Sequence, residues 1–188
     1  DNGSLRIDGT DGLLITGTFA NGATINSEVT GAGTRMFFNP RTGGFRAGTV
    51  DGNQWDGSSI GNYSTAMGFS TTASGVASAA FGDDTVASNF ASVAMGTNSV
   101  ASGNSATSIG SFNTASGTAS VAIGANNEAS GNTSTAMGSN TEATGSRSTA
   151  MGANTEASGV HSTAMGSYTL ASGQNSTAMG YNTEASGY

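Results

Sequence analysis

The chain has 188 residues, of which only 9% are charged, and it contains 30 glycines, one proline, no lysine and no cysteine. Its net charge is −7 and its five basic residues are scattered arginines, so it lacks the basic stripe that binds nucleic acid. The absence of cysteine excludes a disulfide framework and thiolate metal ligands. No apolar run approaches the roughly 18 residues of a membrane span.

The first sixty residues are predicted to form a β-rich cap, distinct from residues 61–188. Short apolar stretches separated by Asp-Gly and Asn-Gly pairs, which favour tight turns, predict strands at 5–7, 13–19 and 23–25. Aromatic and apolar residues gather in three further stretches, at 34–41, 45–48 and 54–56. A repetitive β-structure needs a terminal unit that seals its first edge, and we expect residues 1–60 to supply it.

A ligand-contact tip is the alternative interpretation of this segment. The single tryptophan, four of the eight phenylalanines and four of the five arginines lie in it, and arginine and tryptophan are frequent binding hot spots. The contact residues would be Arg35, Arg41, Arg46 and Trp55.

From residue 61 onward the chain repeats every 14 residues without an insertion. The block Ser-Thr-Ala-Met-Gly occurs nine times with small changes, at 64–68, 78–82, 92–96, 106–110, 120–124, 134–138, 148–152, 162–166 and 176–180. A second block, Ala-Ser-Gly, recurs in step as far as residue 187. Each half-repeat reads Ser/Thr-x-Ala-x-Gly-x-x, in which the alternating residues predict a strand and the glycine with two small or polar residues predicts a turn. A glycine in every seven residues would cost a helix about 1 kcal/mol each.

Two short strands in 14 residues predict one coil of a parallel β-solenoid. Nine coils stacked about 4.8 Å apart make a rod on the order of 40 Å long. Side chains alternate across a strand, and so tight a coil has room only for small ones inside. We therefore expect the Ser/Thr, Ala and Gly that recur every seven residues to point inward. The chain ends two residues before a tenth block would begin, and we expect the repeat to continue.

The two strands of each coil differ on their outward side. The Ala-Ser-Gly strands carry Thr, Val, Glu or Leu beside Ser or Thr, which is typical of a solvent face. The Ser-Thr-Ala-Met-Gly strands carry a continuous apolar stripe, larger than a soluble monomer usually exposes. We expect another chain to cover it, most often in a closed homo-oligomer. The predicted interface residues are Met67, Phe81, Met95, Ile109, Ile123, Met137, Met151, Met165, Met179, Val93 and Val121.

These blocks resemble the head repeats of YadA-like trimeric autotransporter adhesins, whose signature is close to Ser-Val-Ala-Ile-Gly. Residues 120–124 reproduce that signature. The resemblance covers residues 62–188 and implies a left-handed parallel β-roll in which three chains pack around an axis through the Ile/Met strands. Similar repeats occur in phage tail fibres and fibre-like surface proteins. This chain departs from the pattern by favouring Met over Ile at the interface position, which softens the packing.

The resemblance implies an extracellular structural or adhesive segment, on a cell surface, an outer membrane or a virion fibre. Its partners would be two further copies of itself and a host-cell, matrix or glycan receptor, bound multivalently. We expect no enzymatic activity, cofactor or nucleic-acid partner, and no membrane span in this segment. An ice-binding solenoid is the alternative of another class, because outward threonines form a column at 65, 135, 149, 163 and 177. The Met, Ile or Phe beside that column, and its interruptions, disfavour this alternative.

Candidate residues for catalysis or metal binding are few. His161 falls at a turn position that elsewhere holds Ala, Ser, Thr or Arg, which indicates a surface turn. The glutamates at 128, 142, 156 and 184 could suggest a calcium ladder, but the Gly-Gly-x-Gly-x-Asp loops of calcium-binding solenoids are absent, so we favour a solvated face. Asp83 and Asp84 form one irregular turn that could hold a cation weakly. Asparagines at 98, 126, 140, 154 and 182 suit a left-handed turn and could stack along the rod.

Overall fold

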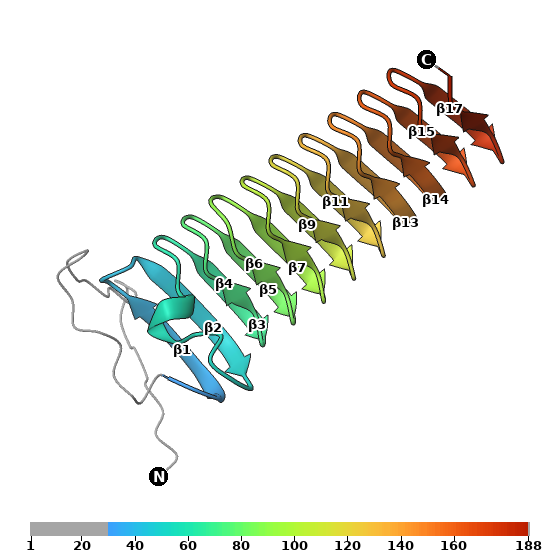
Figure 1. Ribbon diagram of the computed structural model, residues 1–188. Helices are drawn as coiled ribbons and strands as arrows, with labels where there is room; N and C mark the ends of the chain where they lie inside the picture. The colour runs from blue at the N-terminus through green and yellow to red at the C-terminus, as the bar shows by residue number, and fades with distance from the viewer. Residues whose placement is uncertain (1–29, 188) are drawn as a thin grey trace, which may run out of the picture.

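The computed structural model describes residues 30–187 (Figure 1). The strands predicted at 5–7, 13–19 and 23–25 lie outside these residues. From residue 61 the chain forms a parallel β-solenoid of nine coils, which Figure 1 shows as a row of evenly spaced rungs. The all-β solenoid expected from the repeat is thereby confirmed.

Each coil consists of a long strand and a short strand joined by turns. The long strands are β3 (Thr65–Phe69), β5 (Ala79–Asp83), β7 (Val93–Thr97), β9 (Thr107–Ser111), β11 (Val121–Ala125), β13 (Thr135–Ala143), β14 (Thr149–Ala157), β15 (Thr163–Ser167) and β17 (Thr177–Tyr181). The short strands are β4 (Thr72–Ala73), β6 (Val86–Ala87), β8 (Val100–Ala101), β10 (Thr114–Ala115), β12 (Glu128–Ala129), β16 (Leu170–Ala171) and β18 (Glu184–Ala185). In β13 and β14 the strand continues through the corner and includes both parts.

Successive coils pair in parallel, with each residue beside the one 14 positions later. Ala66 pairs with Ala80, and Ala80 with Ala94. The register never slips between β3 and β17, because the repeat itself never changes length. Residues at the same position of the repeat therefore form a straight column along the rod.

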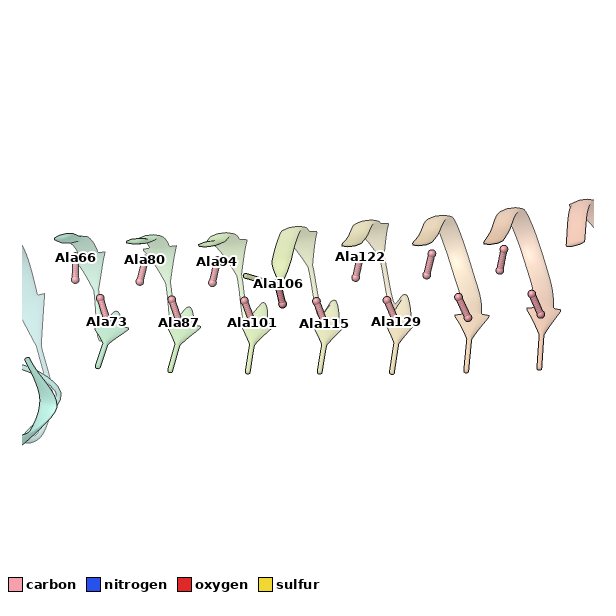
Figure 2. Close-up of a cluster of buried hydrophobic side chains, with 14 of the residues drawn as sticks. Ala66, Ala73, Ala80, Ala87, Ala94, Ala101, Ala106, Ala115, Ala122 and Ala129 are labelled. Carbon is pink, nitrogen blue, oxygen red and sulfur yellow. The ribbon is translucent and has the colours of Figure 1, made fainter. Parts of the chain in front are cut away.

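The interior is a double column of alanines. Ala66 from the long strand and Ala73 from the short strand are both fully buried, and the same pair recurs in the following coils (Figure 2). Ser64 and Thr71 and their counterparts are buried beside them. In one coil the two residue types are exchanged: Ala106 stands at the position of Ser64, and Ser108 stands at the position of Ala66. The expectation that small residues fill the coil is confirmed for Ser, Thr and Ala.

Only one of the two glycine columns points inward. Gly75 and its counterparts are buried, whereas Gly68 and its counterparts are half-buried or exposed. Gly68 has a φ of 128°, and a Cβ built on it would lie 1.9 Å from the carbonyl oxygen of Gly82. Both columns are glycine because the neighbouring coil's backbone passes too close for any side chain; a Cβ on Gly75 would lie 1.9 Å from the carbonyl oxygen of Asn89. The expectation that the Gly68 column also faces the interior was wrong, because its members are not buried.

A left-handed residue occurs every seven positions, from Tyr63 to Asn182. The φ angles of these residues lie between 46° and 60°, although most are not glycine or asparagine. Their N–H groups donate across to the preceding coil; that of Asp84, for example, bonds to the carbonyl of Phe69 at 3.0 Å. These bonds hold residues in a conformation that costs roughly 1 kcal/mol or more outside glycine. The left-handed turns predicted for Asn98, Asn126, Asn140, Asn154 and Asn182 are confirmed.

The segment before the repeats is already stacked on the first coil. Strands β1 (Gly33–Asn39) and β2 (Gly44–Val50) form an antiparallel hairpin, followed by a short 3₁₀ turn at Gly57–Ser59. β2 then pairs in parallel with β3, with Arg46 beside Ala66 and Gly48 beside Gly68. β2 thus acts as one more long strand, in which each residue lies beside the residue 20 positions later instead of 14. The division into residues 1–60 and 61–188 stays a prediction.

Candidate interaction face

The large apolar side chains of the solenoid lie outside it. Between residues 61 and 187 no Met, Ile, Leu, Val, Phe or Tyr side chain is buried, and the buried residues are Gly, Ala, Ser, Thr and Asn alone. A coil two strands thick offers no room for anything larger. The apolar residues that would form the core of an ordinary domain are therefore all available to other surfaces.

Two columns of outward side chains on the long strands form what we call the apolar face. The first column runs Met67, Phe81, Met95, Ile109, Ile123, Met137, Met151, Met165 and Met179. The second runs Thr65, Ala79, Val93, Thr107, Val121, Thr135, Thr149, Thr163 and Thr177. Neither column contains a charged residue. The predicted interface residues all lie on this face, and their role in an interface stays a prediction.

Members of the apolar face shield one another only in part. Met67, Met95 and Met179 keep 41%, 39% and 60% of their surface exposed, and the other members of the Met column are half-buried. Each residue stands in register with those 14 positions before and after it, and its side chain keeps part of its surface exposed to solvent. The face is thus a flat apolar strip along the whole solenoid.

The short strands turn a different surface outward. Glu128, Glu142 and Glu156 are exposed and stand beside one another in register. In the earlier coils the same column holds Thr72, Val86, Val100 and Thr114, which are half-buried. Among residues 30–187, no three His, Cys, Asp or Glu side chains are grouped so that they could hold a metal ion.

Arg46 lies in the interior, at the end of the alanine column. It is fully buried, and its guanidinium donates to the carbonyl oxygens of Phe45, Ser64 and Ala73 and to Oγ of Ser64 at 2.8–3.0 Å. Burial lowers the pKa of Arg46 to about 10, which leaves the group charged at neutral pH. The expectation that Arg46 contacts a ligand is corrected, because its donors are directed at the first coil.

Trp55 occupies the other half of this end of the interior. It is fully buried, and its indole N–H donates to the carbonyl of Thr71 at 2.8 Å. Phe37 packs edge-on against it at 6.3 Å, and the guanidinium of Arg35 lies 5.9 Å from its ring centre. Trp55 is therefore also withdrawn from any ligand. Of the four predicted tip residues only Arg41 is exposed, while Arg35 is half-buried and donates to the carbonyl of Gly31.

The sequence interpretation missed two buried asparagines, Asn113 and Asn127. Their Nδ2 groups each donate to two carbonyls at 2.8–2.9 Å, one in the same coil and one in the next. The backbone N–H of Asn127 donates to Oδ1 of Asn113 at 2.9 Å. These two residues, which replace the buried Thr or Ser of other coils, form hydrogen bonds along the rod. The available signal was their spacing of 14 at a position that holds threonine in six of the nine coils. The stacking expected for the asparagines at 98, 126, 140, 154 and 182 stays a prediction.

His161 lies at an exposed turn, as predicted. Its Nε2 accepts a hydrogen bond from Arg147 at 2.9 Å, because a guanidinium can only donate. Its Nδ1–H then donates to Oδ1 of Asn175 at 3.2 Å. The three side chains come from successive coils and form a ladder on the surface.

Comparison with known families identifies the repeat. The YadA head domain repeat (2 copies) matches residues 59–85, 87–113, 115–141, 143–169 and 171–188. The chain belongs to the YadA head domain repeat family. No curated protein matches the chain. Within the part of the chain that the structure describes, no helix is long and apolar enough to cross a membrane.

Proposed function

We propose that this chain is a trimeric, extracellular head or fibre segment that presents a repetitive surface for attachment. The observation that carries the proposal is the apolar face, which extends over nine coils without a charge. A lone chain would expose all of it, and soluble monomers rarely leave so large a patch to water. Between residues 61 and 187 the buried apolar residues are alanines alone, so association would add the burial that the coil itself lacks.

A further copy of this chain is the partner that fits this face best. The Met column rises by one coil at a time, roughly 4.8 Å between parallel strands. A partner must have the same rise per coil if its side chains are to interdigitate over all nine coils. A second copy of this chain has that rise because it has the same repeat. Closed rings of identical chains are the common way to cover such a face completely. Membership of the YadA head family supports three chains, a left-handed roll and an axis beside the Met column.

In this proposal the N-terminal segment, predicted as residues 1–60, caps the rod. The first coil would otherwise present unpaired carbonyl groups, which invite edge-to-edge association. Arg46 and Trp55 donate to three of these carbonyls, those of Ser64, Ala73 and Thr71. The Gly61 N–H also donates to the carbonyl of Ala73 at 3.0 Å.

The attachment role rests on the family, whose members are surface-exposed adhesins. Three identical chains would present the polar short-strand faces and the turns outward in three copies. A receptor on a host cell, in the matrix or on a glycan would then be held by avidity instead of by one strong site. The chain would work at a cell surface or on a virion fibre, as a structural element and not as an enzyme.

Two substitutions test the assignment of the faces. Met95→Asp would bury an unpaired carboxylate in the trimer, which costs about 3–5 kcal/mol and raises the dissociation constant by at least about 100-fold. Glu142→Ala removes a charge from the solvent face and should leave the mass of the assembly unchanged. Sedimentation equilibrium measures both, with far-UV circular dichroism to verify folding. If Met95→Asp assembles like the parent, the apolar face is not the interface.

A further inference from the structure

The apolar face does not begin with the repeats. In the hairpin, Met36 pairs with Ala47, and Ala47 pairs with Met67. Phe38 likewise pairs with Phe45, and Phe45 with Thr65. Both outward columns of the solenoid therefore continue across β2 to β1, even though these strands precede the residues that match the family repeat.

The hairpin divides its side chains between two faces in the same way as the coils. Arg46 and Phe37 are on its inner side, where Phe37 packs against Trp55. Met36 and Phe38 are on its outer side, with 68% and 41% of their surface exposed. Met36 is thus more exposed than any methionine of the repeats. An end unit whose only task was to seal the first coil would have no need of these two side chains.

We infer that the outer face of the β1–β2 hairpin is part of the self-association surface, and that the hairpin of a second copy of this chain covers Met36 and Phe38. This rests on the proposed function, since it extends the interface proposed for the coils. Because the hairpin continues both columns in register, chains that lie parallel and unshifted bring the hairpins together. A copy shifted by even one coil, or reversed, leaves these side chains uncovered or opposite another part of the rod.

The natural lack of cysteine makes this arrangement measurable. Met36→Cys places one thiol on the outer face of the hairpin, and Met67→Cys places one in the same column on the first coil. A third variant, Arg41→Cys, places a thiol on the exposed hairpin turn, away from the apolar face. Each variant of residues 1–188 is oxidised under mild conditions and analysed on a non-reducing gel, with its native mass measured before oxidation.

The expected result is disulfide-linked chains for Met36→Cys and Met67→Cys, and at least about tenfold less for Arg41→Cys. If the Met67→Cys variant cross-links and the Met36→Cys variant does not, the hairpin inference is overturned and the proposed function is left intact. A monomeric mass with no cross-links in any variant would overturn both. Efficient cross-linking of Met36→Cys only when mixed with Met179→Cys would show reversed chains and overturn the unshifted parallel arrangement.

A charge substitution gives a second readout. The double variant Met36→Asp/Phe38→Asp should raise the dissociation constant by more than about tenfold, while the circular dichroism spectrum stays that of the parent, because both side chains face outward. Arg41→Asp, on the same hairpin, is the matched control and should change the constant less than about twofold. Equal constants for the double variant and the parent would contradict the inference, whatever Met95→Asp does.

Discussion

The side chain of Asn113 accepts a hydrogen bond from the backbone N–H of Asn127, the residue at the same position of the next coil, at 2.9 Å. Oδ1 of Asn127 in turn accepts from the N–H of Thr141 at 3.0 Å and from its Oγ1 at 2.7 Å. Three coils are thereby joined through buried side chains as well as through the strands. The two coils that carry these asparagines are also the two that carry isoleucine on the apolar face.

Removal of the Asn113 side chain should weaken the middle of the rod. Asn113→Ala leaves the carbonyls of Ile109 and Gly124 and the N–H of Asn127 without that partner. A buried polar group without a hydrogen-bond partner costs about 1–3 kcal/mol. Because the neighbouring structure relaxes, the three costs do not add in full, and we expect the unfolding free energy to fall by about 3 kcal/mol.

Asn113→Thr is the matched control, because threonine occupies this position in six of the nine coils. It should cost less than half as much as alanine in the same denaturant titration. Equal losses for the two variants would mean that the amide ladder contributes nothing beyond filling space.

The exposed glycine column should be intolerant of any side chain where another coil follows. A Cβ on Gly138 would lie 2.0 Å from the carbonyl oxygen of Gly152. Gly138→Ala must therefore separate two coils, and we expect a loss of about 3 kcal/mol or more. Thermal unfolding followed by circular dichroism measures it.

Gly180→Ala separates the steric effect from the conformational one. Gly180 has a φ of 114°, similar to that of Gly138, but the nearest atom to its Cβ would be 3.8 Å away. Only the backbone strain remains, and it costs about 1 kcal/mol. A Gly180→Ala variant as unstable as Gly138→Ala would refute the close-approach explanation.

Acid should remove one contribution to the stability of the N-terminal segment. Oδ1 of Asp51 accepts hydrogen bonds from Ser70 and Gln54, both at 2.6 Å. The bond from Ser70 has the larger effect, followed by that from Gln54, and both lower the pKa of Asp51. A lowered pKa in the folded state stabilises the fold above the unfolded pKa of about 3.9. That stabilisation disappears as the pH falls through the lowered value.

The melting temperatures of the parent and of Asp51→Ala should therefore differ at pH 7 and converge below about pH 4. Asp51→Asn retains an acceptor oxygen without a titrating proton and should lie between the two at pH 7. A gap between parent and Asp51→Ala that is constant from pH 7 to pH 3 would contradict this assignment.

The repeat region could be predicted from the sequence because each position of the 14-residue repeat has one place in each coil. Alternation put Ala66 and Met67 on opposite faces, the narrowness of the coil put the small residue inside, and the constant period fixed the register. The glycine column at Gly68 was assigned to the wrong side, because alternation assumes ordinary strand backbone and this residue has a positive φ. Close approach of neighbouring backbones is a tertiary effect that the pattern does not encode.

The N-terminal segment could be predicted only as β-structure. The spacing from Arg46 to Ala66 differs from the repeat, so periodicity could not reveal that β2 stacks on β3. The hot-spot argument failed for Arg46 and Trp55 for a related reason. At the end of a narrow interior filled by alanine, these large side chains with several donors satisfy exposed carbonyls, and composition alone does not distinguish that use from ligand binding.

The mass of the folded chain in solution tests the central claim most directly. Sedimentation equilibrium of residues 1–188 at several concentrations should give three chains of 18.3 kDa each, with no dissociation on dilution. A monomer at every concentration would contradict the account. It would leave the apolar face uncovered and favour a single-chain solenoid that binds a flat, repetitive surface such as ice.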